Sequence, residues 1–80
     1  MHYVYIIRSI SFPDKIYVGC TSDLKKRLSN HNSGTTPHTD KFKPWKLVVY
    51  LGFENKQNAI DFEEYLKSGS GRAFRDKRLL

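Results

Sequence analysis

Alternating apolar and polar positions mark three segments of the chain as β-strands. Residues 3–8 and 16–20 alternate in this way and are rich in Tyr, Val and Ile, which strands favour. The turn-forming pair Pro13-Asp14 lies between them, so we expect an antiparallel hairpin with a long loop. A third run of apolar residues, 46–51, predicts a third strand.

Helical signals follow the second of these strands. Thr21, Ser22 and Asp23 can each cap a helix, and Gly34 suits its left-handed end, which gives a helix of about three turns. Residues 35–45 contain two prolines and no hydrophobic period, so we expect a loop there.

The last third of the chain predicts two more helices. Asn55 caps the first, which runs to about Ser68, where the glycines of segment 69–71 break it. Residues 72–78 are strongly basic and predict a short terminal helix. The element order is then β-β-α-β-α-α, which predicts an α/β fold with a three-stranded, mostly antiparallel sheet flanked by helices.

Size and charge narrow the class of protein. The 80 residues form a single domain, 1–80, near the lower size limit for a self-sufficient core. The net charge of +6 favours polyanions such as nucleic acid as partners.

Cys20 is the only cysteine, which excludes an internal disulfide and a multi-cysteine zinc site and is typical of a reducing, cytoplasmic setting. The first apolar run stops at Arg8, so we expect no signal or membrane-spanning segment.

Glu63 is the most informative charged residue of the predicted helices. Helical geometry places it within the apolar arc formed by Ala59, Phe62 and Leu66. A carboxylate that faces a core needs a partner. That partner is either a metal ion or Lys67, four residues later, in an ordinary helical pair worth roughly 0.2–0.5 kcal/mol.

Arg27 and His31 flank the leucine stripe of the first predicted helix. They suit a boundary arginine that lays its stem on apolar surface and a partly buried histidine. The strand before the helix brings Tyr17 nearby, which favours a functional site over this structural interpretation.

These residues together resemble the GIY-YIG nuclease superfamily. The resemblance is carried by Tyr3-Val4-Tyr5, Tyr17-Val18-Gly19, Arg27 ten residues after Tyr17, and Glu63. The run from Tyr17 to Gly34 and the pair Pro44-Trp45 look like the small standalone bacterial members. The resemblance covers nearly the whole chain.

The resemblance implies divalent-metal-dependent endonuclease activity on DNA phosphodiester bonds. Tyr17 would be the general base that activates water, and Tyr5 would help hold that water or the scissile phosphate. Glu63 would bind one Mg²⁺ or Mn²⁺, and Arg27 would neutralise charge on the phosphate. His31 stands where some relatives have a tyrosine or histidine near the nucleophile.

Two mechanisms are compatible with the sequence. An ordinary phenol has a pKa of about 10, so a tyrosine base needs nearby positive charge. Alternatively, the metal activates the water and Tyr17 only orients it.

Three further residues are candidates for binding substrate. Several family nucleases have a lysine where this chain has Cys20, so one phosphate contact is missing. Lys67 and Arg72 flank a Ser-Gly-Ser-Gly segment that can hold phosphate or act as a hinge. Gly19 either lets the substrate backbone approach the strand or marks a bulge.

The sequence is compatible with several functions. A domain of this size has little surface for reading a long sequence, so we expect a structure-directed nuclease of the repair and recombination type, or reliance on a targeting protein. A catalytically weak or inactive relative that binds nucleic acid or a partner protein is the main alternative. A module of the RNA-recognition type ranks lower, because it requires a different strand order. A purely structural protein leaves the inward Glu63 unexplained.

Overall fold

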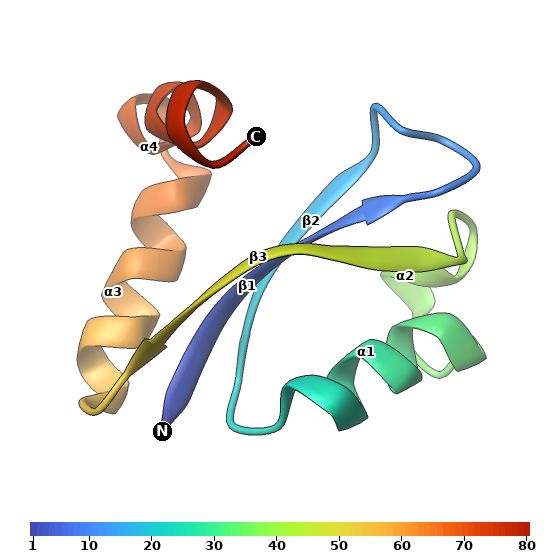
Figure 1. Ribbon diagram of the computed structural model, residues 1–80, viewed down its shortest axis with the longest axis horizontal. Coiled ribbons are helices and arrows are strands. Elements are labelled where there is room, and N and C mark those ends of the chain that lie inside the picture. The colour runs from blue at the N-terminus through green and yellow to red at the C-terminus, as the bar shows by residue number, and fades with distance from the viewer.

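Three antiparallel strands form the centre of the molecule. The computed structural model describes all residues, 1–80, and contains β1 (His2–Ser9), β2 (Ile16–Thr21) and β3 (Trp45–Phe53). Their order in the sheet is β2-β1-β3, so β1 is central and both other strands are edges (Figure 1). The predicted hairpin and third strand are confirmed. The sheet and its connections differ from the RNA-recognition order, which removes that alternative.

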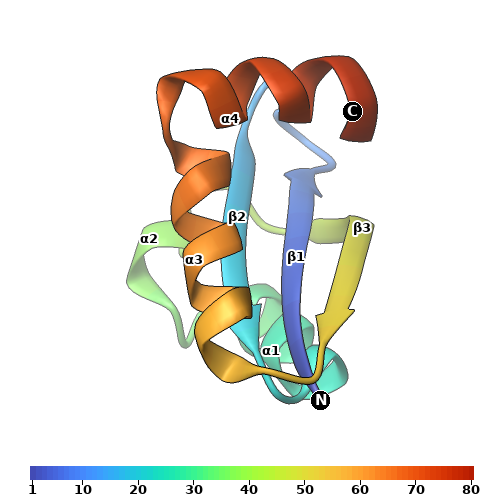
Figure 2. The same cartoon turned by 90° about the vertical axis from the view of Figure 1, so that its left-hand side faces the viewer.

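Helices cover both faces of this sheet. One face carries α3 (Lys56–Lys67) and α4 (Gly69–Phe74), and the other carries α1 (Leu24–Ser33) and the one-turn α2 (Pro37–Asp40) (Figures 1 and 2). A π-helical turn, η1 (Arg75–Leu79), continues α4. None of these helices combines the length and the apolar surface needed to cross a bilayer.

The capping residues of the two long helices behave as the sequence predicts. Asp23 accepts a hydrogen bond from the backbone N–H of Lys26 at the start of α1, and Gly34 ends that helix with a φ of 83°. Asn55 accepts from the N–H of Asn58 at the start of α3.

Two local predictions were incomplete. The segment expected to be a loop contains α2, because Pro37 has no N–H to lose in the first turn of a helix. The terminal helix begins at Gly69 rather than Arg72. The reason is Ser68, whose hydroxyl donates to the Tyr65 carbonyl at 2.6 Å and accepts from the Gly71 N–H at 3.2 Å, so that one residue ends α3 and caps α4.

The strand β1 buries side chains on both faces and so divides the core in two. Val4 and Ile6 pack with Val18 against α3, together with Ala59 and Leu66. On the other face, the core consists of Tyr5, Ile7 and Trp45, with Tyr17, Leu24, Leu28 and Phe42 packed around it. Because successive strand residues point to opposite faces, the tyrosines of β1 and β2 meet on the α1 side.

The joint between α3 and α4 predicts opposite effects for two neighbouring glycines. A Cβ on Gly71 would overlap the backbone carbonyl of Tyr65, whereas a Cβ on Gly69 would meet nothing within 4 Å. We expect Gly71→Ala to lower the free energy of unfolding by at least about 2 kcal/mol, because a clash with backbone atoms cannot be relieved by a change of side-chain rotamer. Gly69→Ala should be neutral or stabilising by up to about 1 kcal/mol. Urea unfolding measures both, and equal effects would contradict the close packing of the two helices.

Candidate active site

Tyr5 lies buried in the middle of the sheet, over a glycine. The register pairs Tyr5 with Gly19, and a Cβ on Gly19 would overlap the Tyr5 hydroxyl and ring. The Tyr5 residue is only 2% exposed. The expectation that Gly19 admits substrate is therefore corrected: the Tyr5 side chain already fills the space, and Gly19 makes room for it.

Hydrogen bonds tie the Tyr5 phenol to α1 and α2. The Tyr5 hydroxyl lies 2.8 Å from Nε2 of His31, and Nδ1 of His31 lies 2.8 Å from Oγ1 of Thr39. All three side chains are buried. The Thr39 carbonyl in turn accepts from Nε1 of Trp45 at 2.8 Å. The sequence analysis missed Thr39 because it treated its segment as a loop.

The environment fixes the protonation of this pair. Burial, and next the neighbouring Tyr17, raise the pKa of Tyr5 to about 12, although the charge and hydrogen bonding of Arg27 act in the opposite direction. Burial and the Arg27 charge lower the pKa of His31. At neutral pH both groups are therefore uncharged. Because the Thr39 hydroxyl donates to the Thr36 carbonyl at 3.3 Å, it accepts from the imidazole, so we assign the proton of His31 to Nδ1 and the phenol donates to Nε2.

Tyr17 lies above this pair and is the more accessible phenol. Its ring centroid is 5.0 Å from that of His31 and 6.4 Å from that of Tyr5. Tyr17 is half-buried, whereas Tyr5 and His31 are closed off from solvent. Of the three rings, only Tyr17 is placed to meet a substrate.

Arg27 borders the same cluster from α1. It is close enough to Tyr5 to affect its pKa by charge and by hydrogen bonding. It also lines a polar cleft of about 440 Å³ at the start of α1, together with Thr21, Ser22, Asp23, Lys26 and Asn30. Arg27 therefore connects the buried rings with a solvent-accessible cleft.

Glu63 approaches from the opposite face of the sheet. Its side chain is 21% exposed, and Oε2 accepts a hydrogen bond from Nζ of Lys67 at 2.9 Å. Burial and then the Glu63 charge raise the pKa of Cys20, and the same charge contributes to the raised pKa of Tyr5. Glu63 thus lies partly buried on α3, and its observed partner is Lys67, the helical pair that the sequence pattern allowed as an alternative to a metal ion.

A second hollow lies on the other side of Tyr17. It has a volume of about 280 Å³ and is lined by Ile16, Tyr17, Val18, Lys67, Arg72 and Arg75. The structure thus brings the predicted binding residues Lys67 and Arg72 to the predicted base. The sequence analysis missed Arg75, although it lies three residues after Arg72, on the same face of a helix.

The site residues are compatible with a divalent cation. Mg²⁺ prefers oxygen ligands and in phosphoryl-transfer sites uses one or two carboxylates, waters and substrate phosphates. Glu63 supplies one carboxylate, of which one oxygen is held by Lys67. No group of three or more His, Cys, Asp or Glu side chains is arranged to hold a metal anywhere in the molecule, including at Glu63. A cation at Glu63 would therefore depend on substrate phosphates to complete its ligands.

Comparison with known proteins finds relatives in sequence and in structure. The family model described as the GIY-YIG catalytic domain matches residues 1–77. A UPF0213 protein of Clostridium perfringens is 40% identical over 68 residues, which cover 84% of this chain and 71% of that protein. The solution structure of the UPF0213 protein from Bacillus halodurans is 31% identical, with a TM-score of 0.52, and the match covers 90% of this chain and 78% of that one.

Longer eukaryotic proteins match as well. The structure-specific endonuclease subunit slx1 of Talaromyces marneffei is 32% identical over 65 residues, 74% of this chain. The chain spans only 17% of the length of that relative.

The buried His31 predicts a specific loss of stability in mild acid. The pKa of His31 is lowered in the folded protein, whereas in the unfolded chain it is about 6.5. Between these values the unfolded chain binds more protons, so the free energy of unfolding falls as the pH drops below about 6.5, by at most about 1.4 kcal/mol per pH unit.

Urea unfolding between pH 7.5 and pH 5.5 measures this slope. His31→Gln should remove most of it, and His38→Gln, at an exposed position, should leave it unchanged. An unchanged slope in the His31 variant would contradict a neutral, buried imidazole.

Proposed function

The chain belongs to the GIY-YIG catalytic domain family, and on this basis we propose that it is a divalent-metal-dependent endonuclease that hydrolyses DNA phosphodiester bonds. One observation carries the proposal: the half-buried Tyr17 packs against His31 on the α1 side and lines a hollow with Lys67, Arg72 and Arg75 on the other, and Lys67 in turn holds the Glu63 carboxylate. In the proposal, the acid of α3, the phenol of β2 and the guanidinium of α1, which come from distant parts of the sequence, act on one phosphate.

Tyr17 acts as the general base in this proposal. As the phenolate, it takes a proton from the attacking water, whose oxygen bonds to phosphorus while the bond to the leaving strand oxygen breaks. The leaving oxygen departs as an alkoxide and takes a proton from solvent. Arg27 stabilises the negative charge that develops on the phosphate oxygens. The alternative, in which Tyr17 only orients the water, requires the same placement.

Tyr5 and His31 act as positioning residues. The family resemblance implied that Tyr5 holds the water or the phosphate and that His31 lies near the nucleophile, but their side chains are buried and hydrogen-bonded to each other. We infer that their rings pack against the ring of Tyr17 and so fix the direction of its hydroxyl. A neutral pair suits this task, because it leaves the positive charge of the site to Arg27 and the cation.

Glu63 would hold the Mg²⁺ or Mn²⁺ ion. When bound, the cation supplies charge stabilisation to the phosphate and to the leaving oxygen. The pair between Glu63 and Lys67 means that the ion and the ammonium group share one carboxylate.

The DNA substrate is proposed to be chosen by shape. The slx1 relatives carry the name of a subunit of a structure-specific endonuclease. The net charge of +6 gives affinity for phosphates without base contacts. We propose a preference for branched, nicked or single-stranded features in repair or recombination, in a cytoplasmic setting, with a partner protein for targeting.

A second candidate is a domain that binds nucleic acid without cutting it. The observation in its favour is the Glu63–Lys67 ion pair, because the carboxylate already has a cationic partner. Cleavage assays separate the two candidates.

Labelled branched, nicked and single-stranded DNA with Mg²⁺ or Mn²⁺ tests the nuclease. Removing one charge-stabilising donor typically costs about 100- to 1000-fold in rate, so we expect losses of that order for Arg27→Ala. Tyr17→Phe and Glu63→Gln should fall at least as far. His38→Gln serves as the matched control, and activity that survives all three changes would show that another protein in the sample cuts the DNA.

Lys67 predicts opposite effects on metal and DNA. Lys67→Gln frees the Glu63 carboxylate, so Mn²⁺ should bind roughly 2- to 5-fold more tightly, since a partly exposed pair is worth at most about 1 kcal/mol. DNA binding should weaken. Calorimetric titration of Mn²⁺ and anisotropy of labelled DNA measure the two effects, with Lys25→Gln on α1 as control. Unchanged Mn²⁺ affinity would place the cation elsewhere than at Glu63.

A further inference from the structure

The hollow beside Tyr17 contains more positive charge than the proposed reaction uses. Arg27, on the α1 side, already faces the phosphate that is cut. On the other side of Tyr17, Lys67, Arg72 and Arg75 line one hollow and come from α3, α4 and η1. Three separate elements thus converge on a place where the hydrolysis requires no cation.

Much of this charge is not neutralised within the protein. Lys67 is paired with Glu63, and Nε of Arg75 donates to Asp76 at 3.1 Å, which leaves the terminal nitrogens of Arg75 free of an ion pair. Arg72 has no ion-pair partner. Guanidinium groups that lack an internal acid are suited to binding phosphate oxygens.

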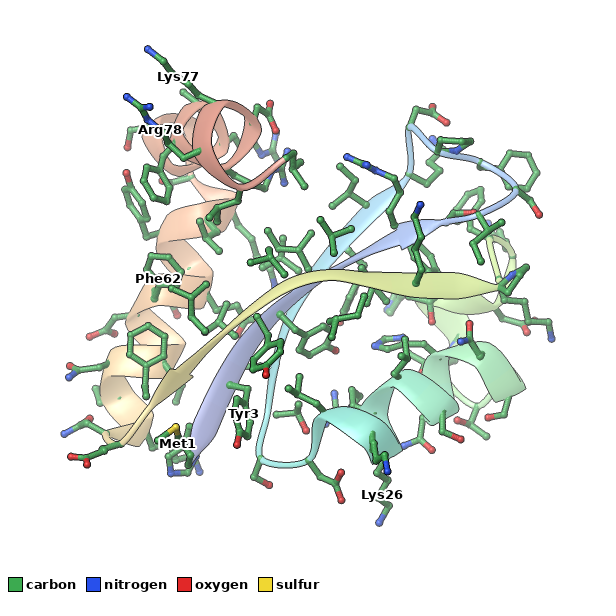
Figure 3. All side chains as sticks on the ribbon, in the orientation of Figure 1. Met1, Tyr3, Lys26, Phe62, Lys77 and Arg78 are labelled. Atoms are coloured by element: carbon green, nitrogen blue, oxygen red, sulfur yellow. The ribbon has the colours of Figure 1, made fainter.

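Arg75 is held in place rather than extended into solvent. Its side chain is 18% exposed, and it begins the π-helical turn η1. Such turns are rare and occur frequently at functional sites. By contrast, Lys77 and Arg78 of the same turn point away from the sheet (Figure 3).

The hollow and the cleft of Arg27 lie at opposite ends of β2. The hollow is lined by residues at the start of the strand, Ile16 to Val18, and the cleft by Thr21 at its end. A strand of six residues extends about 16 Å, which corresponds to about five phosphates per strand along the axis of a DNA duplex, at about 3.4 Å of axis each. Because β2 is an edge strand, its outer side faces no other strand.

We propose that Arg72 and Arg75 bind a second, uncut phosphate of the substrate strand, so that the DNA strand lies along the outer edge of β2 with Tyr17 between two phosphate sites. The inference rests on the proposed nuclease function for its ligand. It adds a site whose task is to hold and orient the strand, and it assigns Arg75 to substrate binding.

The test is the salt dependence of DNA binding without cleavage. The Glu63→Gln background in EDTA prevents cutting, and anisotropy of a labelled three-way junction gives the affinity. Arg72→Gln and Arg75→Gln should each lower the slope of log K against log salt by about 0.9. Between about 50 and 200 mM salt, each variant should then lose roughly 3-fold less affinity than its parent.

Matched variants distinguish a site from general charge. Lys77→Gln and Arg78→Gln remove the same formal charge from side chains that point away, and they should leave the slope closer to that of the parent. Arg75→Lys should keep most of it. If all four Gln variants change the slope equally, the proposed site does not exist. Arg72 is exposed, so its variant provides the test even if Arg75→Gln destabilises the fold.

Neutral methylphosphonate links, introduced one at a time along the DNA, locate the contact. The parent should lose affinity at two separated positions, and the Arg72 and Arg75 variants should become insensitive at only one of them. Sensitivity at a single position would overturn the second site. If the wild-type chain binds in this way but cuts nothing with Mg²⁺ or Mn²⁺, the nuclease proposal fails and the phosphate site stands.

Discussion

The hydrogen bond between the buried Tyr5 phenol and the His31 imidazole organises the site. It joins the central strand to α1, and through Thr39 it extends to α2. Both partners are uncharged at neutral pH, because burial opposes the charged form of each group. A charged group at this position would carry a desolvation cost. Because both partners are neutral, their hydrogen bond can be buried inside a small core.

Because β2 is an edge strand, residues from both faces of the sheet can reach it. On a central strand, residues of opposite faces are kept apart by neighbours on both sides. On β2, Tyr17 is within reach of His31 from the α1 side and lines a hollow with Lys67 from the α3 side. This placement brings Lys67, Arg72 and Arg75 to one phenol, and Lys67 connects that group to Glu63.

The strands, the long helices and their caps could be predicted from the sequence, because they depend on local patterns. Asp23, Gly34 and Asn55 mark helix ends whatever the tertiary structure is. The family resemblance identified the tyrosines, Arg27 and Glu63 but not their exposure. That Tyr5 and His31 are buried beneath Tyr17 follows from the pairing of Tyr5 with Gly19, and no local pattern specifies that register.

Two residues escaped prediction for different physical reasons. Thr39 lies on a single helical turn between two prolines, too short for a hydrophobic period. Arg75 looked like one of many surface cations, and its position in the hollow depends on how closely α4 crosses α3.

The hydroxyl of Ser68 has a consequence for the mechanics of the molecule. It donates to the Tyr65 carbonyl of α3 and accepts from the Gly71 N–H of α4, so two hydrogen bonds brace the joint between these helices. The Glu63 carboxylate on α3 and the guanidinium groups of Arg72 and Arg75 beyond the joint are then held at a nearly constant separation. In the proposed complex, a DNA backbone would have to adapt to that separation, and locally pliable stretches would do so at the lowest energetic cost.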